Sequence, residues 1–170
     1  MSADVPLELE HVTVRLHADF DLRLSADIGV DADEKEKNFL TRALAAFAVH
    51  RLAHCGLDDA VAAVVDGGGD FGLDAIHFSS ASATLWLVQS KFDASGRGEP
   101  DLGSVSKFCD GIDALLRGNF EPFADNAEIM SRRPDLLHHL QTPGLQIRTV
   151  LVYSGLALIS EDRRIYLIAC

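Results

Sequence analysis

The sequence is poor in cysteine and has no long apolar run. Its three cysteines, Cys55, Cys109 and Cys170, are far apart in the 170 residues. An odd number of widely spaced cysteines argues for reduced thiols rather than a disulfide framework. No apolar run approaches the roughly 20 residues of a membrane-spanning helix, and the N-terminus has neither the basic start nor the apolar core of a signal peptide. We therefore expect a cytoplasmic protein with no membrane partner.

Basic residues are also scarce. Lysine and arginine number 15 against 26 aspartate and glutamate residues, which gives a formal net charge of −11. Proteins that bind nucleic acid on their own usually carry a basic face, so strong autonomous DNA binding is disfavoured. A metal-dependent nuclease is not excluded, because a divalent cation requires carboxylates and partly cancels their charge.

The length and the ordinary apolar content fit one globular domain with its own core. Helical spacing of apolar residues predicts a helix over about 33–54, capped by Asp31 or Asp33 and stopped near Gly56. A short turn or helix follows at Asp58, and residues 62–65, which are small or branched and apolar, fit a strand. Further strands are expected at 73–78, 84–91, 146–153 and 164–169, and further helices at 102–116 and 122–140. This order predicts an α/β (α+β) fold with a central mixed sheet flanked by helices.

The two ends of the chain are less regular. Alternating apolar residues within 1–30 fit two short strands or an extended arm, which leaves 31–170 as the main domain. The sequence stops inside the apolar run 165–170, whereas termini are usually polar or frayed. We therefore expect the chain to be the N-terminal part of a longer protein.

Two neighbouring segments carry the chemistry. Asp74 lies in the predicted strand 73–78, and Gln89 and Lys91 share one face of the strand 84–91 because side chains alternate along a strand. A hairpin that pairs Ser79 with Thr84 would set Asp74 opposite Gln89, with Cβ atoms roughly 5 Å apart. The pattern thus predicts that a carboxylate, an amide oxygen and an ammonium converge.

Such a group suits phosphodiester hydrolysis. Asp74, the amide oxygen of Gln89 and the carbonyl of Ser90 are candidate ligands of Mg²⁺ or Mn²⁺, because hard cations prefer oxygen. A bound cation would polarise the phosphate and activate a water. Lys91 would orient that water, stabilise the developing charge or act as a base, and the sequence leaves these three roles open.

The same stretch resembles a known nuclease superfamily. The residues Asp66, Gly67, Asp70, Gly72, Asp74, Ala75 and Ile76, followed by Gln89, Ser90, Lys91 and Phe92, are similar to the PD-(D/E)XK superfamily. The Gln-x-Lys form resembles the Mrr-like restriction endonucleases, and the nearest likeness is to the nuclease region of the AIPR (abortive infection phage resistance) proteins. The resemblance spans about 33–154. It implies a restriction-endonuclease-like core, a Mg²⁺-dependent endonuclease and a bacterial anti-phage role. We favour DNA over RNA as the expected substrate, and a homo-oligomer stays open as a partner.

Gln89 departs from the superfamily's commonest pattern, in which a second acid stands at this place. The missing negative charge would weaken binding of the metal. A helical acid often completes such sites, and Glu36, then Glu34, are the candidates here.

Other interpretations stay open. The domain could be an inactive nuclease-fold module that acts as a sensor or docking unit in a larger defence protein. A phosphatase or nucleotide hydrolase that uses Asp66 and Asp70 is a third class, although the glycine-rich segment 66–70 is best explained as a tight turn. Four basic residues of the later helices are either solvated or contact phosphate: Lys107, Arg117, Arg132 and Arg133.

Overall fold

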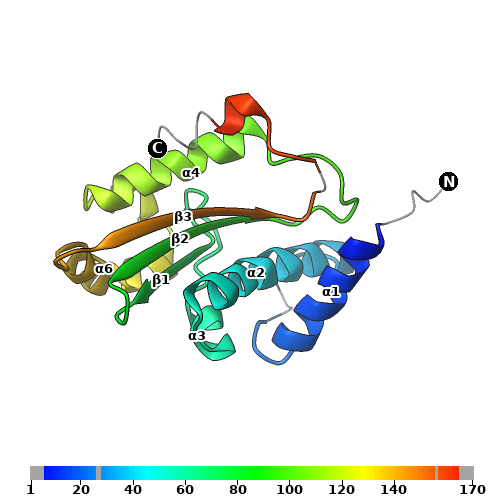
Figure 1. Ribbon diagram of the computed structural model, residues 1–170, viewed down its shortest axis with the longest axis horizontal. Helices are drawn as coiled ribbons and strands as arrows, with labels where there is room; N and C mark the ends of the chain where they lie inside the picture. Colours follow the sequence, from blue (N-terminus) through cyan, green and yellow to red (C-terminus); the bar gives the residue numbers. More distant parts are fainter. Residues whose placement is uncertain (1–5, 26–27, 156, 165–170) are drawn as a thin grey trace.

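The computed structural model describes residues 6–25, 28–155 and 157–164, and it has an α+β fold (Figure 1). The elements in chain order are α1 (Leu7–Phe20), α2 (Ala32–Ala53), α3 (Leu57–Ala62), β1 (Ala75–Ser79), β2 (Thr84–Lys91), α4 (Leu102–Leu116), the 3-10 helix η1 (Glu121–Phe123), α5 (Ala127–Ser131), α6 (Arg133–Leu140) and β3 (Gln146–Tyr153). The predicted fold class, a mixed sheet flanked by helices, is confirmed.

The sheet has the strand order β1-β2-β3, with β2 in the centre. The strands β1 and β2 form an antiparallel hairpin, whereas β2 and β3 run parallel. The predicted register is confirmed from the Ser79–Thr84 pair to the Ala75–Val88 pair. Asp74 does not continue this register, because its N–H donates to the carbonyl of Val88 at 2.8 Å. The expected direct pairing of Asp74 with Gln89 is therefore not formed.

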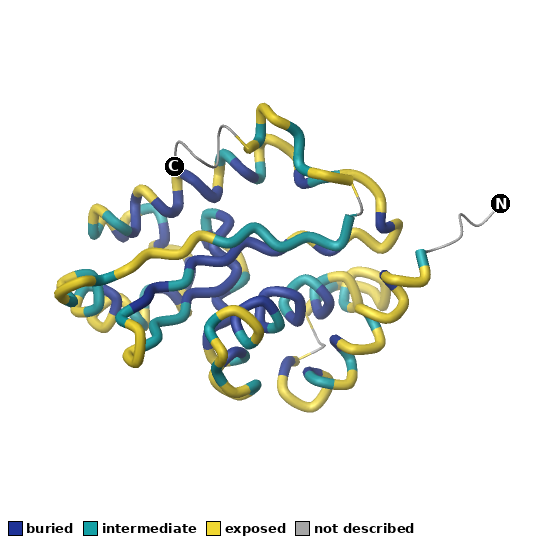
Figure 2. Tube along the Cα trace, viewed as in Figure 1, coloured by how far each residue is buried: buried dark blue, intermediate teal, exposed yellow. Residues whose placement is uncertain are grey.

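Helices cover both faces of the sheet and create two apolar cores. Helix α2 lies on one face together with α1 and α3, and α4 lies on the other face (Figure 1). The first core joins the helices α1 to α3 to Ala75 and Val88. The second joins α4 to the opposite side of the hairpin, including Leu85 and Leu87. The central strand β2 is consequently buried over most of its length, whereas the first half of β3 is exposed (Figure 2).

The N-terminal segment differs from its prediction. Residues 7–20 form the helix α1 rather than short strands or an arm. Leu9, Leu16 and Phe20 are buried against α2, whereas Val14 of the apparent alternation is 68 % exposed. The burial thus follows the 3.6-residue period of a helix, not the two-residue period of a strand. Residues 1–5 and 26–27 lie outside the described part.

Local signals explain where the helices begin and end. The Asp31 side chain accepts the N–H of Glu34 at 2.8 Å and caps α2, as predicted. Helix α2 ends at His54, which has a left-handed φ of 54°, and Gly56 instead precedes α3. The single helix expected over 122–140 is wrong. Asn126 caps the separate helix α5, and Pro134, which has no N–H to donate, lies in the first turn of α6.

The structure also bears on two further predicted strands and on the state of the cysteines. The expected strand 62–65 is reduced to one bridge between Val64 and Ala75, because α3 extends to Ala62. The expected strand 164–169 lies almost entirely outside the described residues. Cys55 is a free thiol but Cys109 is disulfide-bonded, so the expectation of three reduced thiols is wrong. Among the described helices, none has both the length and the apolar character to cross a membrane.

Candidate metal centre

Asp74 lies immediately before β1 and is tied to the neighbouring strand. Its Oδ2 accepts the backbone N–H of Ser90 at 2.5 Å and lies 3.2 Å from the Ser90 hydroxyl. That hydroxyl is also 2.8 Å from the carbonyl of Thr41 on α2. Asp74 is only 6 % exposed. The carboxylate is therefore fixed between the end of β2 and the helix α2.

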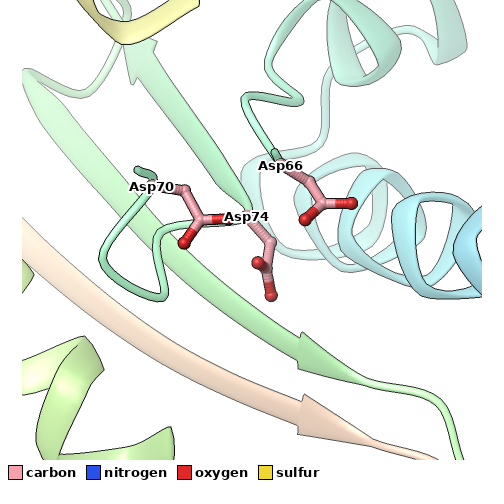
Figure 3. Close-up of side chains that lie close together, drawn as sticks. All are labelled: Asp66, Asp70 and Asp74. Atoms are coloured by element: carbon pink, nitrogen blue, oxygen red, sulfur yellow. The ribbon is translucent and has the colours of Figure 1, made fainter. Parts of the chain in front are cut away.

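Two further aspartates converge on Asp74 (Figure 3). One carboxylate oxygen of each of Asp66, Asp70 and Asp74 lies within 4.8 Å of the others. The backbone explains the meeting, because the N–H groups of Val65 and Asp66 both donate to the carbonyl of Asp74, at 2.9 and 3.1 Å. The glycine-rich segment 67–72 then folds back and brings Asp70 to the same place. We call these three carboxylates the acidic cluster.

Asp70 is held by the loop that it closes. Its carboxylate accepts the N–H groups of Gly67 at 3.1 Å and Gly72 at 2.7 Å. Lys107 of α4 approaches the same carboxylate at 3.5 Å. The tight turn expected at 66–70 is thus present, but it also serves to place an acid beside Asp74.

The cluster is electrostatically strained when it holds no cation. Burial raises the pKa of Asp74 to about 7, and the charges of Asp66 and Asp70 add to the rise, against a lowering by the hydrogen bond from Ser90 and by the charge of Lys91. The pKa of Asp66 is also raised, first by burial and then by Asp70. Buried carboxylates that repel one another favour either a proton or a cation.

The donor set fits a hard divalent cation. It consists of carboxylate oxygens, the ligands that Mg²⁺ and Mn²⁺ prefer. The sequence interpretation identified Asp74 but treated Asp66 and Asp70 as a turn with at most a helping role. The missed signal was their spacing: an aspartate every four residues, separated by glycines that let the chain fold back sharply.

The side chain of Gln89 lies on the α4 side of the sheet, whereas that of its neighbour Ser90 faces α2. The Gln89 side chain is 1 % exposed, and Nε2 donates to the carbonyl of Ser104 on α4 at 3.1 Å. It also packs against Gly72, where an added Cβ would come within 2.7 Å of Nε2. Its Oε1 is buried and has no hydrogen-bond partner among the described residues. That orphaned oxygen is a further candidate ligand beside the loop that carries Asp70.

Lys91 has a different environment. It is exposed at the end of β2 and lines a cleft of about 800 Å³ between α2 and the segment 92–101. Its charge lowers the pKa values of both Asp74 and Asp66, so it lies within electrostatic range of the acidic cluster. The charged residues that line the cleft are Asp33, Glu36, Asp93, Glu99, Asp101, Lys37, Lys91 and Arg97. Acids therefore outnumber bases around Lys91.

The helical acids are engaged elsewhere. Glu36 lines the same cleft, but its Oε1 lies 2.9 Å from Nε2 of His17 on α1. Burial lowers the pKa of His17, but hydrogen bonds to Asp21 and Glu36 outweigh this and leave the pKa raised. Glu34 accepts the N–H of Val30. Neither glutamate belongs to the acidic cluster.

The predicted metal ligands thus have unequal positions. Asp74 is central, and Ser90 contacts it through its N–H and hydroxyl, whereas the prediction used the Ser90 carbonyl. Asp66 and Asp70, rather than Glu36, supply the further carboxylates next to Asp74.

Comparisons with models of known families, with curated proteins and with solved structures give no match. The resemblance to PD-(D/E)XK nucleases consequently depends on the quoted residues alone, and no family membership is assigned.

Proposed function

We propose that the chain is a metal-dependent endonuclease domain that hydrolyses nucleic-acid phosphodiester bonds, with DNA as the favoured substrate. The observation that carries the proposal is the convergence of Asp66, Asp70 and Asp74 within 4.8 Å, with Lys91 in electrostatic range at the end of the adjacent strand. A role in anti-phage defence rests only on the resemblance of the motif. The cytoplasmic location was expected from the cysteines and the N-terminus, and the disulfide at Cys109 removes the first of these two arguments.

Each group has a chemical task in this proposal. Asp74, Asp66 and Asp70 would hold Mg²⁺ or Mn²⁺, and the buried Oε1 of Gln89 is a candidate further ligand. The cation would supply a polarised phosphate and an activated water. Lys91 is exposed to the cleft, so its ammonium can meet a phosphate oxygen and stabilise the charge that develops there. Of the three roles that the sequence leaves open for Lys91, the proposal adopts this one.

A cleavage assay tests this assignment. Supercoiled plasmid is incubated with Mg²⁺ or Mn²⁺ and the wild type, Lys91→Ala or Lys37→Ala. Lys37 is a matched control because it is an exposed lysine that lines the same cleft. Loss of cleavage in Lys91→Ala, with cleavage retained in Lys37→Ala, supports the proposal. Equal cleavage by both variants would show that Lys91 has no catalytic role.

A second function is favoured by one specific observation. The cleft around Lys91 is mostly acidic, which disfavours a polyanionic substrate and suits a non-catalytic sensor or docking module. Calorimetry separates the two functions. Mn²⁺ binding that disappears in Asp74→Asn favours the enzyme, whereas absence of binding at millimolar Mn²⁺ favours the module. Turnover of a small phosphomonoester that survives Lys91→Ala would instead favour a phosphatase.

A further inference from the structure

Three arginines gather around a small pocket next to the acidic cluster. Arg23 follows α1, Arg42 lies on α2, and Arg132 follows α5. They line a pocket of about 350 Å³ together with Asp66, one member of the acidic cluster. In a chain of net charge −11, three guanidinium groups around one pocket stand apart from the prevailing charge. Their meeting could not be read from the sequence, because they come from positions far apart in the chain.

Among the N–H donors of these three arginines, one is buried and lacks an acceptor within the described residues. Two of the guanidinium groups are partly committed: Arg23 donates to Asp58 and to the carbonyl of Asp19, and Arg132 donates to two backbone carbonyls. Arg42 donates Nη1 to the carbonyl of Ser25. The Nε of Arg42 is buried and has no hydrogen-bond partner among the described residues. A buried N–H without an acceptor is costly, so a shift of the Arg42 side chain that lets Nε meet an acceptor in the pocket would be favourable.

The groups that line the pocket carry a small excess of positive charge, although Arg23 is also paired with Asp58, outside the lining, at 2.9 Å. The lining has three guanidinium groups against two carboxylates, those of Asp66 and Glu128. Glu128 is 3.5 Å from Arg132 and neutralises part of that charge, and Asp66 is shared with the acidic cluster. A guanidinium fork with a free donor matches the oxygens of a phosphate better than any other common biological anion except a carboxylate.

We propose that this pocket binds a phosphate group of the nucleic-acid strand whose neighbouring phosphodiester lies at the acidic cluster. The inference rests on the proposed function for the identity of the substrate. It adds a positioning role for Arg42, which would fix the nucleic-acid strand relative to Asp66. It also identifies a surface on which a strongly acidic domain can bind a polyanion. Arg42 does not touch the reacting atoms in this account.

Binding of short single-stranded DNA tests the proposal. The full chain is titrated, with Ca²⁺ in place of Mg²⁺, into a 3′-labelled oligonucleotide that carries either a 5′-phosphate or a 5′-hydroxyl, and fluorescence anisotropy is recorded. We expect Arg42→Gln to bind roughly 10- to 100-fold more weakly, the range for loss of a charged hydrogen bond. Arg42→Lys keeps the charge and should fall between this variant and the wild type. A preference for the 5′-phosphate would identify a terminal phosphate as the ligand, and equal binding would identify a backbone phosphodiester.

Arg51→Gln is the matched control, because Arg51 is an exposed arginine on the same helix and does not line the pocket. Binding by Arg42→Gln within twofold of the wild type, equal losses in Arg42→Gln and Arg51→Gln, or no binding by the wild type would each overturn the proposal. If Arg42→Gln fails to fold by circular dichroism, Arg23→Gln, at the more exposed side of the pocket, replaces it under the same criteria.

The two proposals fail in distinguishable ways. Plasmid cleavage by the wild type, combined with unchanged DNA binding in Arg42→Gln, would refute only the phosphate pocket. Binding that depends on Arg42 without any cleavage by the wild type would refute the nuclease and leave the phosphate pocket standing.

Discussion

Asp74 and Ser90 are joined by a 2.5 Å hydrogen bond from the Ser90 N–H to Oδ2 of Asp74, and the Ser90 hydroxyl bridges Asp74 and the carbonyl of Thr41. This pair connects the acidic cluster to the helix α2. A carboxylate that accepts a backbone N–H from a central strand has little freedom to move. The position of Asp74 is therefore a property of the sheet and not of a loose loop.

Removal of the Ser90 hydroxyl should destabilise the fold. Ser90→Ala removes the hydroxyl's hydrogen bond to the carbonyl of Thr41 and its contact with the buried Asp74 carboxylate, which costs about 0.5–1.5 kcal/mol. Ser131→Ala removes a comparable hydroxyl-to-carbonyl bond at an exposed site and should cost less than about 0.5 kcal/mol. Urea denaturation measures the free energy of unfolding of both variants. Equal losses would show that the Ser90 hydroxyl stabilises the fold no more than the exposed Ser131 hydroxyl does.

The metal-free protein should lose stability as the pH rises. Asp74 has a pKa of about 7 in the folded chain and about 3.9 when unfolded, so the folded state binds the proton more tightly. Stability is then highest at or below about pH 4 for this group and falls until about pH 7, at up to about 1.4 kcal/mol per pH unit. Saturating Mg²⁺ should oppose the fall.

Asp74→Asn isolates this effect. The raised pKa values of Asp66 and His17 act in the same direction and persist in the variant. Denaturation in EDTA at pH 5 and pH 8 should show that the wild type loses on the order of 2 kcal/mol more than Asp74→Asn. Identical losses in the two proteins would mean that Asp74 does not titrate as described.

Gly72 is required for the close approach of the loop to β2 and α4. It has a φ of +76°, and an added Cβ would lie 2.7 Å from Nε2 of Gln89 and 3.1 Å from the backbone of Phe108. Gly144 has a similar φ of +72° but open space around it. Both alanine variants carry the same backbone strain, so Gly72→Ala should be less stable than Gly144→Ala by about 1–3 kcal/mol. Thermal unfolding measures the difference, and comparable transition temperatures would contradict the contact.

The sequence predicted the hairpin and α4 well because local signals agreed there. Thr84 to Lys91 alternate on a strand that both cores bury, and Asp101 caps α4 at Ser104. The N-terminal helix was missed because two exposed valines imitate the two-residue period of a strand. The contacts that make it a helix, such as Leu16 and Phe20 against α2, are tertiary.

The site was also predicted only in part, because some of its residues are brought together by tertiary contacts. Asp74 and Lys91 follow from strand positions, but the approach of Asp66 and Asp70 depends on how the loop folds back. Glu36 was favoured as the helical acid because α1 was not foreseen, and it is His17 of α1 that takes up the Glu36 carboxylate. Gln89 was placed beside Asp74 by strict strand pairing, which Asp74 does not follow.

The most direct test of the account is calorimetric titration of the metal-free protein with Mn²⁺. The acidic cluster predicts one site whose affinity falls by at least roughly tenfold in Asp74→Asn, because the negative charge and one of the two carboxylate oxygens are lost. Asp113→Asn is the control, since Asp113 is exposed on α4 and paired with Arg117, and it should leave the affinity unchanged. Absence of Mn²⁺ binding by the wild type, or equal binding by both variants, would contradict the central claim that Asp66, Asp70 and Asp74 form a metal centre.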